Sequence, residues 1–294
     1  MQKKAASAMK ALEDFDLTSF NSYRIVARCK RAFFPDSEDD IRQLYQNPEY
    51  AGKKIILGSG HNVIFAEDYY QDDFIIFSGN FDRIDVDSTQ ITVEAGATLL
   101  QLSELALDLG LAGLETFYDI PSSVGGAVVM NAGAGGEEIK DLLVKVRYYD
   151  PAKDQFGEIH KEDMGFEYRN SYFQRNPGLI ITQAVLRLEY GNKADIKEKM
   201  DSIKTARWSK QPKDFPNAGS VFKRPPGRFV GPMIDELSLK GFTVGGAQVS
   251  EKHGGFIVNT GYASGKDILG VINHVKAQVM ERFNVDLEIE QRII

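Results

Sequence analysis

Residues 120–134 read Ile120-Pro-Ser-Ser-Val-Gly-Gly-Ala-Val-Val-Met-Asn-Ala-Gly-Ala134, and they are the most informative segment of the chain. Pro121–Gly136 holds five glycines in sixteen residues. Glycine has no Cβ, so its N–H groups lie uncovered and a ligand can approach the backbone closely. A tight turn beside a bulged strand would also explain the glycines. Because Ser122, Ser123 and Asn131 accompany them, contact with a ligand is the favoured interpretation.

A second glycine-rich loop, Gly58-Ser-Gly-His-Asn62, follows the buried-type strand expected at 53–57. A dinucleotide fingerprint needs its third glycine where this chain has Val63, so a Rossmann turn is not supported. The segment Gly261-Tyr-Ala-Ser-Gly-Lys-Asp267 is one spacer short of a phosphate-binding P-loop, and a helix-entry turn is the favoured interpretation there. Together, the loops at 58–62 and 121–136 predict a phosphorylated small-molecule ligand.

Strands and helices are mixed along the chain with no regular βαβ repeat, which predicts an α+β fold. Residues 1–20 are expected to form an irregular lead-in. The expected strands are 53–57, 74–77, 90–94, 144–149 paired with 155–160, 179–190, 247–249, 256–259 and 285–290. The expected helices follow caps at Ser37, Thr98 and Ser264, span 194–208, and include one that begins near Pro232 and ends at Gly241.

The composition excludes several classes of protein. The 294 residues carry a net charge of −7 with no basic block, which argues against nucleic-acid or anionic-membrane binding. No run approaches the roughly 18 apolar residues of a membrane span, and Met1–Asp16 has no apolar core of a secretory signal. The single Cys29 fits a reducing compartment. A cytoplasmic enzyme is therefore expected, and no metal site, because His253 and His274 lack ligand spacing.

Five stretches, in order, resemble motifs of the UDP-N-acetylenolpyruvoylglucosamine reductases, which are FAD-containing enzymes of bacterial cell-wall synthesis. The resemblance runs from about Asn21 to Ile294, and 188–194 leaves no room for the tyrosine loop of the family's longer form. The matching stretches are the flavin loop at 120–134, the first phosphate loop at 58–63, Gly165-Phe-Glu-Tyr-Arg-Asn-Ser171, Asn217-Ala-Gly-Ser-Val-Phe-Lys-Arg-Pro225 and Leu287-Glu-Ile-Glu-Gln-Arg292.

The resemblance implies a two-part FAD-binding region of the vanillyl-alcohol-oxidase type, at 1–80 and at 81–208 joined by the C-terminal strand 285–294. A substrate-binding domain would occupy 209–284, after the proline-punctuated break at 210–217. The protein would be a monomer. FAD would be held noncovalently by Gly58, Ser59, Gly60, His61, Asn62, Pro121, Ser122, Ser123, Gly125, Gly126 and Gly133.

The implied reaction reduces the enolpyruvyl ether of UDP-N-acetylglucosamine to the D-lactyl ether, with NADPH as the hydride donor. Hydride reaches C3 through the flavin, and the enolate that develops needs cations at its carboxylate and an acid at C2. Arg169 would grip the carboxylate with two parallel hydrogen bonds, and Ser220 would protonate C2. Glu290 would orient the carboxylate or hold a proton-relay water, with Glu288 as the alternative.

Four further residues are expected at the substrate. Lys210 matches a family lysine that contacts the UDP-sugar, and Arg224 is a candidate second contact to the diphosphate. Asn217 belongs to the serine motif. Tyr168 either lines the site or packs elsewhere.

Three residues depart from the family pattern. Ser122 stands where a glycine is usual, and His61 where a small residue is common. Gly135-Gly-Glu137 replaces the usual Tyr-Gly-Gly and adds a carboxylate near a phosphate loop. Two alternatives remain open: another FAD oxidase or dehydrogenase on this scaffold, and an inactive nucleotide-sugar binding protein. The first would not need Arg169, Ser220 and Glu290, and the second would not consume NADPH.

Overall fold

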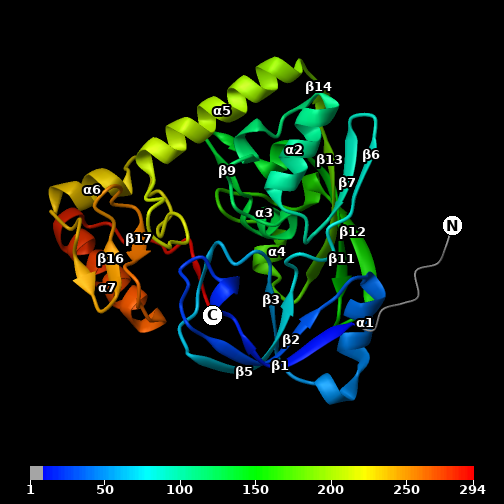
Figure 1. Ribbon diagram of the computed structural model, residues 1–294, viewed down its shortest axis with the longest axis horizontal. Helices are drawn as coiled ribbons and strands as arrows, with labels where there is room; N and C mark the ends of the chain where they lie inside the picture. The colour runs from blue at the N-terminus through cyan, green and yellow to red at the C-terminus, as the bar shows by residue number, and fades with distance from the viewer. Residues whose placement is uncertain (1–8) are drawn as a thin grey trace. The chain divides into compact units, whose positions relative to one another are not determined.

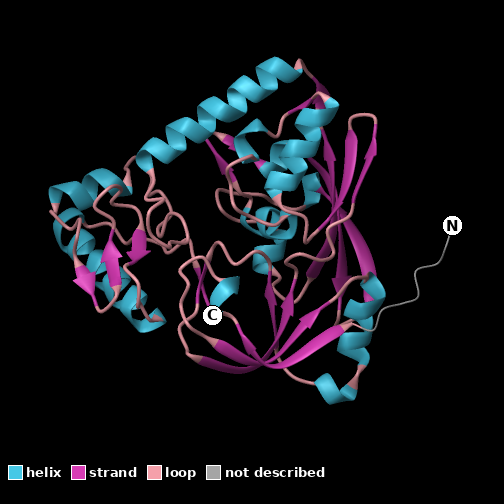
Figure 2. Ribbon diagram, in the orientation of Figure 1, coloured by secondary structure: helices cyan, strands magenta, loops and turns pink. Residues whose placement is uncertain are grey.

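The computed structural model describes residues 9–294 (Figure 1). The chain forms two compact units, and each unit consists of three segments that are separate in sequence. Unit 1 consists of Met1–Phe15, Cys29–Ser59 and Gln71–Ile203, and unit 2 of Asp16–Arg28, Gly60–Tyr70 and Lys204–Ile294. Helices and strands are mixed in both units (Figure 2), so the expected α+β class is confirmed.

The larger sheet of unit 1 has five antiparallel strands in the order β12-β11-β13-β7-β6. The predicted hairpin is confirmed, because Asp150 at the end of one strand pairs with Gln155 at the start of the next. The long strand expected at 179–190 is interrupted at Leu188. The five strands are β6 (Ile84–Asp87), β7 (Gln90–Glu94), β11 (Leu143–Asp150), β12 (Gln155–His160) and β13 (Ile180–Arg187).

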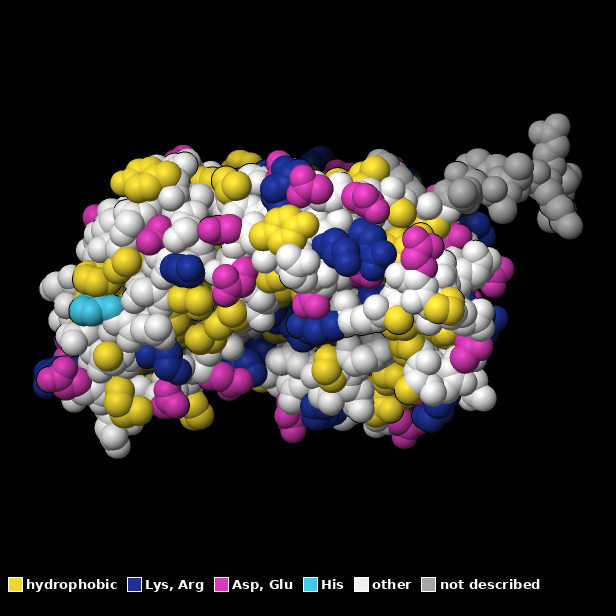
Figure 3. All heavy atoms as spheres, turned by 90° about the horizontal axis from the view of Figure 1, so that it is seen from below, with side chains coloured by type: hydrophobic (Ala, Val, Ile, Leu, Met, Phe, Trp, Pro, Cys, Tyr) yellow, Lys and Arg dark blue, Asp and Glu magenta, His cyan; other side chains and the backbone are white. Residues whose placement is uncertain are grey.

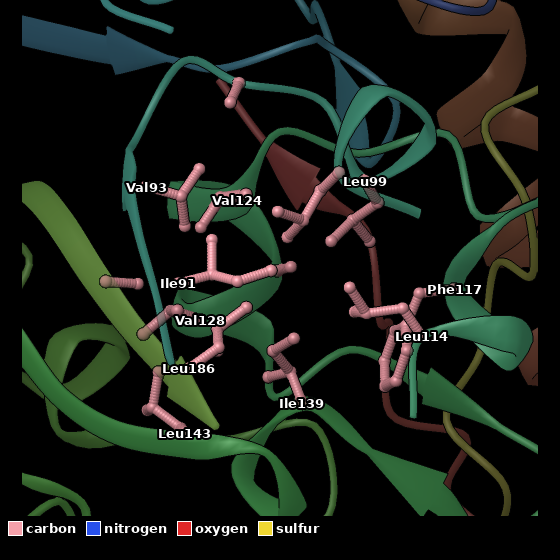
Figure 4. Close-up of a cluster of buried hydrophobic side chains, with 14 of the residues drawn as sticks. Ile91, Val93, Leu99, Leu114, Phe117, Val124, Val128, Ile139, Leu143 and Leu186 are labelled. Carbon is pink, nitrogen blue, oxygen red and sulfur yellow. The ribbon is translucent and has the colours of Figure 1, made fainter. Parts of the chain in front are cut away.

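Helices α2 (Leu99–Leu109) and α3 (Val124–Met130) pack against this sheet through one buried cluster (Figures 1 and 4). As predicted, Thr98 begins α2, here through a capping box with Gln101, and Gly110 ends it with a φ of 71°. Helix α3 lies inside the glycine-rich segment and was not predicted. Its Val124 and Val128 are four residues apart and fully buried. Burial of each side chain contributes roughly 1.5–3 kcal/mol to the stability of the fold.

The second sheet of unit 1 has the strand order β1-β2-β5-β3. Strand β1 (Lys10–Asp16) lies where an irregular lead-in was expected, and that part of the expectation is wrong; the ring of Phe15 packs edge-to-face on Phe34, 5.5 Å between centroids. Residues 1–8 of the lead-in lie outside the described residues. The remaining strands are β2 (Arg28–Phe34), β3 (Lys54–Leu57) and β5 (Tyr69–Ile76), and α1 (Glu38–Gln46) begins after its predicted cap, Ser37.

Unit 2 contains a three-stranded sheet of β15 (Thr243–Val244), β16 (Ala247–Val249) and β17 (Ile257–Asn259). Helix α7 (Gly265–Phe283) begins with the predicted capping box of Ser264 and Asp267. Helix α6 (Val230–Glu236) ends before Gly241, where the sequence had placed its end. In addition, β18 (Arg292–Ile293) pairs in parallel with β4 (Val63–Ile64).

The strand expected at 285–290 is not formed. The segment is extended, with Leu287 buried and its neighbours Asp286 and Glu288 exposed, but only Ile289 makes an isolated bridge, to Phe222. The other short elements are β8 (Leu111–Ala112), β9 (Gly133–Ala134), β10 (Glu137–Glu138), β14 (Glu189–Tyr190), α4 (Tyr172–Arg175) and five 3-10 turns, at Thr18–Phe20, Pro48–Tyr50, Glu115–Phe117, Ile139–Asp141 and Lys161–Asp163. Helix α5 (Lys193–Lys210) covers the predicted 194–208.

Among residues 9–294, no helix combines the length and the apolar character needed to cross a bilayer. The same residues contain no group of three or more His, Cys, Asp or Glu side chains placed to hold a metal ion. On the face drawn in Figure 3, basic and acidic side chains are interspersed rather than gathered by sign.

Candidate functional site

The two glycine-rich loops meet in unit 1. The N–H of Ser123 donates a 3.0 Å hydrogen bond to the hydroxyl of Ser59, although the two residues are 64 positions apart. A side chain at Gly58 would overlap the Ser123 hydroxyl, so the contact requires glycine there. Two of the predicted ligand-binding segments are therefore packed together.

The loops differ in what their N–H groups can offer to an anion. In the described part of the chain, no hydrogen bond uses the N–H groups of Ser59, Gly60, His61 or Asn62. The first N–H groups of α3 are occupied: those of Val124 and Gly125 donate to Ala97 and Ala95, and those of Gly126 and Ala127 to Ser123. The N–H groups of residues 59–62 are therefore open to an anion, whereas those of residues 124–127 are not.

The 58–62 loop is held in place on both sides. Gly60 has a φ of 70°, and a Cβ there would overlap the carbonyl of Phe20. Its own carbonyl accepts a 3.0 Å bond from the N–H of Ser22. The Asn62 amide donates to the carbonyl of Glu290 at 3.2 Å. Donors fixed in this way can receive an anion without reorganising.

His61 has a ring nitrogen with no hydrogen-bond partner within residues 9–294. This nitrogen, Nδ1, is buried. Burial, together with the nearby positive charge of Arg24, lowers the pKa of His61 to about 4. The imidazole is therefore neutral at pH 7.

The carboxylate of Glu137 does not add free negative charge to the flavin loop. It accepts hydrogen bonds from Thr116 and, at 3.1 Å, from Lys199 of α5. Lys199 also lies 3.5 Å from the buried carboxylate of Glu115. Burial opposes ionisation, but these hydrogen bonds lower the pKa of Glu137 on balance. The other departure in this loop, Ser122, donates to the carbonyl of Ser123 at 2.9 Å.

Tyr168 and Arg169 occupy the tip of a tight turn. Glu167 and Asn170 close the turn by exchanging two main-chain hydrogen bonds of 3.1 Å. Arg169 has a φ of 54°, a left-handed conformation that costs a non-glycine residue roughly 1–2 kcal/mol. Strain of this kind is often found at functional sites.

The Arg169 guanidinium reaches back to the flavin loop. It donates to the carbonyls of Asn131 at 3.3 Å and Gly133 at 2.7 Å, and it lies 5.1 Å from the centre of the Tyr168 ring. Tyr168 itself is exposed, so it is not a packing residue of the core. The structure thus brings Arg169 together with a predicted cofactor-binding residue.

Asn131 joins the flavin loop to the turn at 167–170 through its side chain, a role that the sequence did not indicate. It is fully buried and ends α3 with a φ of 45°. Its amide donates to the Glu138 carboxylate at 2.9 Å and to the Glu167 carbonyl at 3.0 Å. Asn131 therefore connects the end of α3 to the turn that carries Arg169.

Ser220 and Glu290 lie on neighbouring chain segments of unit 2. The N–H of Glu290 donates a 2.8 Å bond to the carbonyl of Val221, the residue after Ser220. Ser220 is exposed, and Glu290 is half-buried. Glu288, the alternative acid, is engaged elsewhere, because it forms a 2.6 Å ion pair with Lys223. The contacts therefore favour Glu290 over Glu288 as the acid near the serine.

The remaining predicted substrate residues are less closely grouped. Asn217 bonds within its own loop, since its side-chain amide donates to the carbonyls of Pro212 and Phe215 at 2.8 and 2.9 Å. Arg224 is exposed and lies 5.5 Å from the centre of the Phe229 ring. Lys210 is exposed at the end of α5.

Comparison with known proteins adds independent information. Residues 211–294 match the model of the UDP-N-acetylenolpyruvoylglucosamine reductase C-terminal domain, and residues 30–155 match an FAD binding domain. The chain is 40% identical to the UDP-N-acetylenolpyruvoylglucosamine reductase of Francisella tularensis over 96% of its own length and 99% of that protein. The corresponding Clostridioides difficile protein is 42% identical, over 93% and 90%.

A solved structure agrees with these matches. The crystal structure of the reductase from Thermus caldophilus superposes with a TM-score of 0.82 at 31% identity, and covers 97% of this chain and 98% of that one.

Proposed function

The chain belongs to the UDP-N-acetylenolpyruvoylglucosamine reductase family, and on that premise we propose that Arg169, Ser220 and Glu290 carry its chemistry. The protein is an FAD-dependent oxidoreductase that reduces the enolpyruvyl ether of UDP-N-acetylglucosamine in peptidoglycan precursor synthesis. The match at 30–155 confirms that the chain has an FAD-binding domain, as expected from the sequence.

The residues of the two glycine loops fit FAD. The N–H groups of Ser59–Asn62 are available for its pyrophosphate, and Gly58 allows the loops to pack closely. We assign the cofactor contacts to these residues and to Pro121, Ser122, Ser123, Gly125, Gly126 and Gly133. When bound, FAD supplies hydride transfer from NADPH to C3 of the enolpyruvyl group.

Arg169 would bind the substrate carboxylate, on which negative charge develops as the hydride arrives. Two of its N–H donors already hold main-chain carbonyls, at Asn131 and Gly133, which orients the planar guanidinium. An oriented cation stabilises developing charge without reorganising. The strained turn at Arg169 is consistent with a residue kept for function rather than for stability.

Ser220 would donate the proton to C2. A serine hydroxyl is a weak acid, but an enolate carbon is basic enough to take its proton, and the serine then recovers a proton from solvent. Glu290 would orient the carboxylate or hold the water of that relay. The hydrogen bond from Glu290 to the residue after Ser220 is the observation that carries the assignment, because it joins two predicted catalytic segments far apart in sequence.

Substrate contacts beyond the reacting group are assigned to Tyr168, Lys210, Asn217 and Arg224. Lys210 and Arg224 are exposed cations suited to a diphosphate. The amide of Asn217 donates to the carbonyls of Pro212 and Phe215, which would hold this residue in place in the loop that precedes Ser220.

One assay separates the candidate functions. The purified protein, reconstituted with FAD, should oxidise NADPH only when UDP-N-acetylglucosamine enolpyruvate is added. An FAD oxidase acting on another substrate would not respond to this ether. An inactive nucleotide-sugar binding protein would bind it without consuming NADPH.

The boundaries 1–80, 81–208 with 285–294, and 209–284 remain our proposal for the functional division of the chain. We further propose that the protein works as a monomer in the cytoplasm, where NADPH is available. Cys29 is the single cysteine of the chain and is buried, which suits that compartment. Light scattering of the holoenzyme and cell fractionation would test the two statements.

A further inference from the structure

Gln291 lies between the predicted catalytic Glu290 and Arg292, and its side chain is 4% exposed. Its Nε2 faces the main chain of the serine loop, at 3.0 Å from the carbonyl of Ala218, 3.3 Å from that of Gly219 and 3.5 Å from that of Ser220. Three consecutive carbonyls are thus gathered around one amide nitrogen.

The other end of the amide is held by Tyr23. This tyrosine is fully buried, and its hydroxyl donates a 2.9 Å bond to Oε1 of Gln291, 268 residues away in sequence. Asn259, itself 3% exposed, donates to the carbonyl of Tyr23 at 2.8 Å. The chain Asn259–Tyr23–Gln291 therefore ends at the loop that carries Ser220.

The contacts define which way the amide points. Carbonyl oxygens accept hydrogen bonds only, so the NH₂ group must face the serine loop and Oε1 must face Tyr23. The tyrosine must then be the donor, which requires a protonated hydroxyl. Burial raises the pKa of Tyr23, so the hydroxyl keeps its proton at neutral pH.

Other bonds hold the serine loop on both sides, at Asn217 and at Val221, and Gln291 supplies the contacts to residues 218–220 between them. Gly219 has a φ of 79°, and Ser220 has only an isolated bridge, to Phe256. A hydroxyl that donates a proton to carbon must be held within hydrogen-bond reach of its target. Movement of the loop would therefore slow proton transfer more than it would weaken binding.

We propose that Gln291, oriented by the Tyr23 hydroxyl, is a positioning residue that fixes the main chain at 218–220 and so presents the Ser220 hydroxyl for proton donation. The inference rests on the proposed function, in which Ser220 is the acid. Gln291 touches neither substrate nor cofactor in this account; it acts through the serine loop.

The test must separate positioning from stability. Gln291→Leu alone leaves the buried Tyr23 hydroxyl without its partner and could lower stability for that reason. The double variant Tyr23→Phe/Gln291→Leu removes this unpaired hydroxyl as well, so that only the carbonyls of 218–220 lose a donor. Tyr70→Phe is the matched control, because it deletes another buried hydroxyl of unit 2, which donates to Ile294 at 2.7 Å away from the serine loop.

In the holoenzyme, the double variant should retain FAD and accept hydride from NADPH at the wild-type rate. Reoxidation by the enolpyruvyl substrate should fall at least tenfold, with little change in the substrate concentration for half saturation. Hydrogen exchange at the amides of 218–221 should be faster than in wild type. Tyr70→Phe should match wild type in all three measurements.

A double-mutant cycle completes the test. In a Ser220→Ala background, the Tyr23→Phe/Gln291→Leu change should have almost no further effect on reoxidation, because the group that it positions is gone. Normal reoxidation in the double variant, or a loss that simply adds to that of Ser220→Ala, would overturn the proposal while leaving the assignment of Ser220 intact. If Ser220→Ala itself reoxidises normally, the assignment of the acid fails and the positioning role fails with it.

Discussion

Nη2 of Arg169 lies 2.7 Å from the carbonyl oxygen of Gly133, so the arginine assigned to the substrate carboxylate is anchored to a residue of the flavin loop. Two nitrogens of this guanidinium, Nη1 and Nη2, thus donate to main-chain carbonyls, those of Asn131 and Gly133. This arrangement makes the geometry of arginine, rather than its charge alone, the property to test.

Arg169→Ala should slow substrate reduction severely, by about 3 kcal/mol of transition-state stabilisation, similar to removing one oxyanion donor. Arg169→Lys should recover little of this, because one ammonium cannot both hold the loop carbonyls and grip a carboxylate. Stopped-flow reoxidation of the reduced enzyme would measure the loss. Near-wild-type turnover in Arg169→Ala would remove the residue from the site.

The backbone at Arg169 gives an independent prediction about stability. At a φ of 54°, glycine is relaxed and alanine is strained, so Arg169→Gly should be more stable than Arg169→Ala by about 1 kcal/mol. Neither variant has the guanidinium, so the comparison isolates the backbone. Urea unfolding of the two variants would reveal the order; the reverse order, usual elsewhere, would contradict the left-handed turn.

Ser220→Ala should leave the two half-reactions unequal. Hydride transfer from NADPH involves no proton to the sugar substrate, so flavin bleaching should proceed at close to the normal rate. Reoxidation needs a proton at C2 and should lose roughly two to four orders of magnitude. Solvent deuterium should slow only this second step in wild type. If the variant instead bleaches slowly and reoxidises normally, Ser220 positions the nicotinamide and is not the acid.

FAD should be bound without a covalent link. Of the two side chains that might form one, Cys29 is fully buried in β2, and the Nδ1 of His61 is buried in its loop. Acid or heat denaturation should release all of the flavin into the supernatant, whereas gel filtration of the native protein should retain it. Yellow colour in the precipitated chain would refute the prediction.

His61 should make the flavin-free protein lose stability in mild acid. The pKa of His61 is about 4 in the folded protein and 6.5 in the unfolded chain, so below pH 6.5 the unfolded state binds the extra proton. The contribution of neutral His61 to the free energy of unfolding is therefore complete above pH 6.5. It falls by about 3 kcal/mol in total as the pH is lowered to 4.

Unfolding free energies of wild type and His61→Asn at pH 7.5 and 4.5 would measure this effect. The advantage of wild type over the variant should shrink between the two pH values. A difference that stays constant with pH would show that His61 titrates normally in the folded protein.

Local signals account for the elements that the sequence predicted well. The caps at Ser37, Thr98 and Ser264 each act within one helical turn, and all three begin the helices expected of them. The strand expected at 285–290 fails for a different reason. Its alternation of buried and exposed residues is real, but the pairing with residues 221–223 is limited to one bridge, between Phe222 and Ile289, which is too short for a strand.

The candidate site also contains residues that the sequence identified and residues that it did not. Tyr168 and Arg169 are found through the resemblance of residues 165–171 to a family motif, and their roles at the substrate stay predictions. The pair of Gln291 and Tyr23 is separated by 268 residues, and neither residue type signals the contact. Helix α3 was missed because Gly125 and Gly126 disfavour helices, whereas burial of Val124 and Val128 outweighs that preference.

During synthesis, β4 leaves the ribosome long before the residues with which it pairs. Val63 and Ile64 acquire their parallel partners only when Arg292 and Ile293 have been made, and the neighbouring bond from Asn62 to Glu290 spans 228 residues. Contacts this distant in sequence form late and slow folding. Until then the nascent chain carries an unpaired, buried-type strand beside the 58–62 loop, so this part of unit 2 forms only after the C-terminal residues have been made.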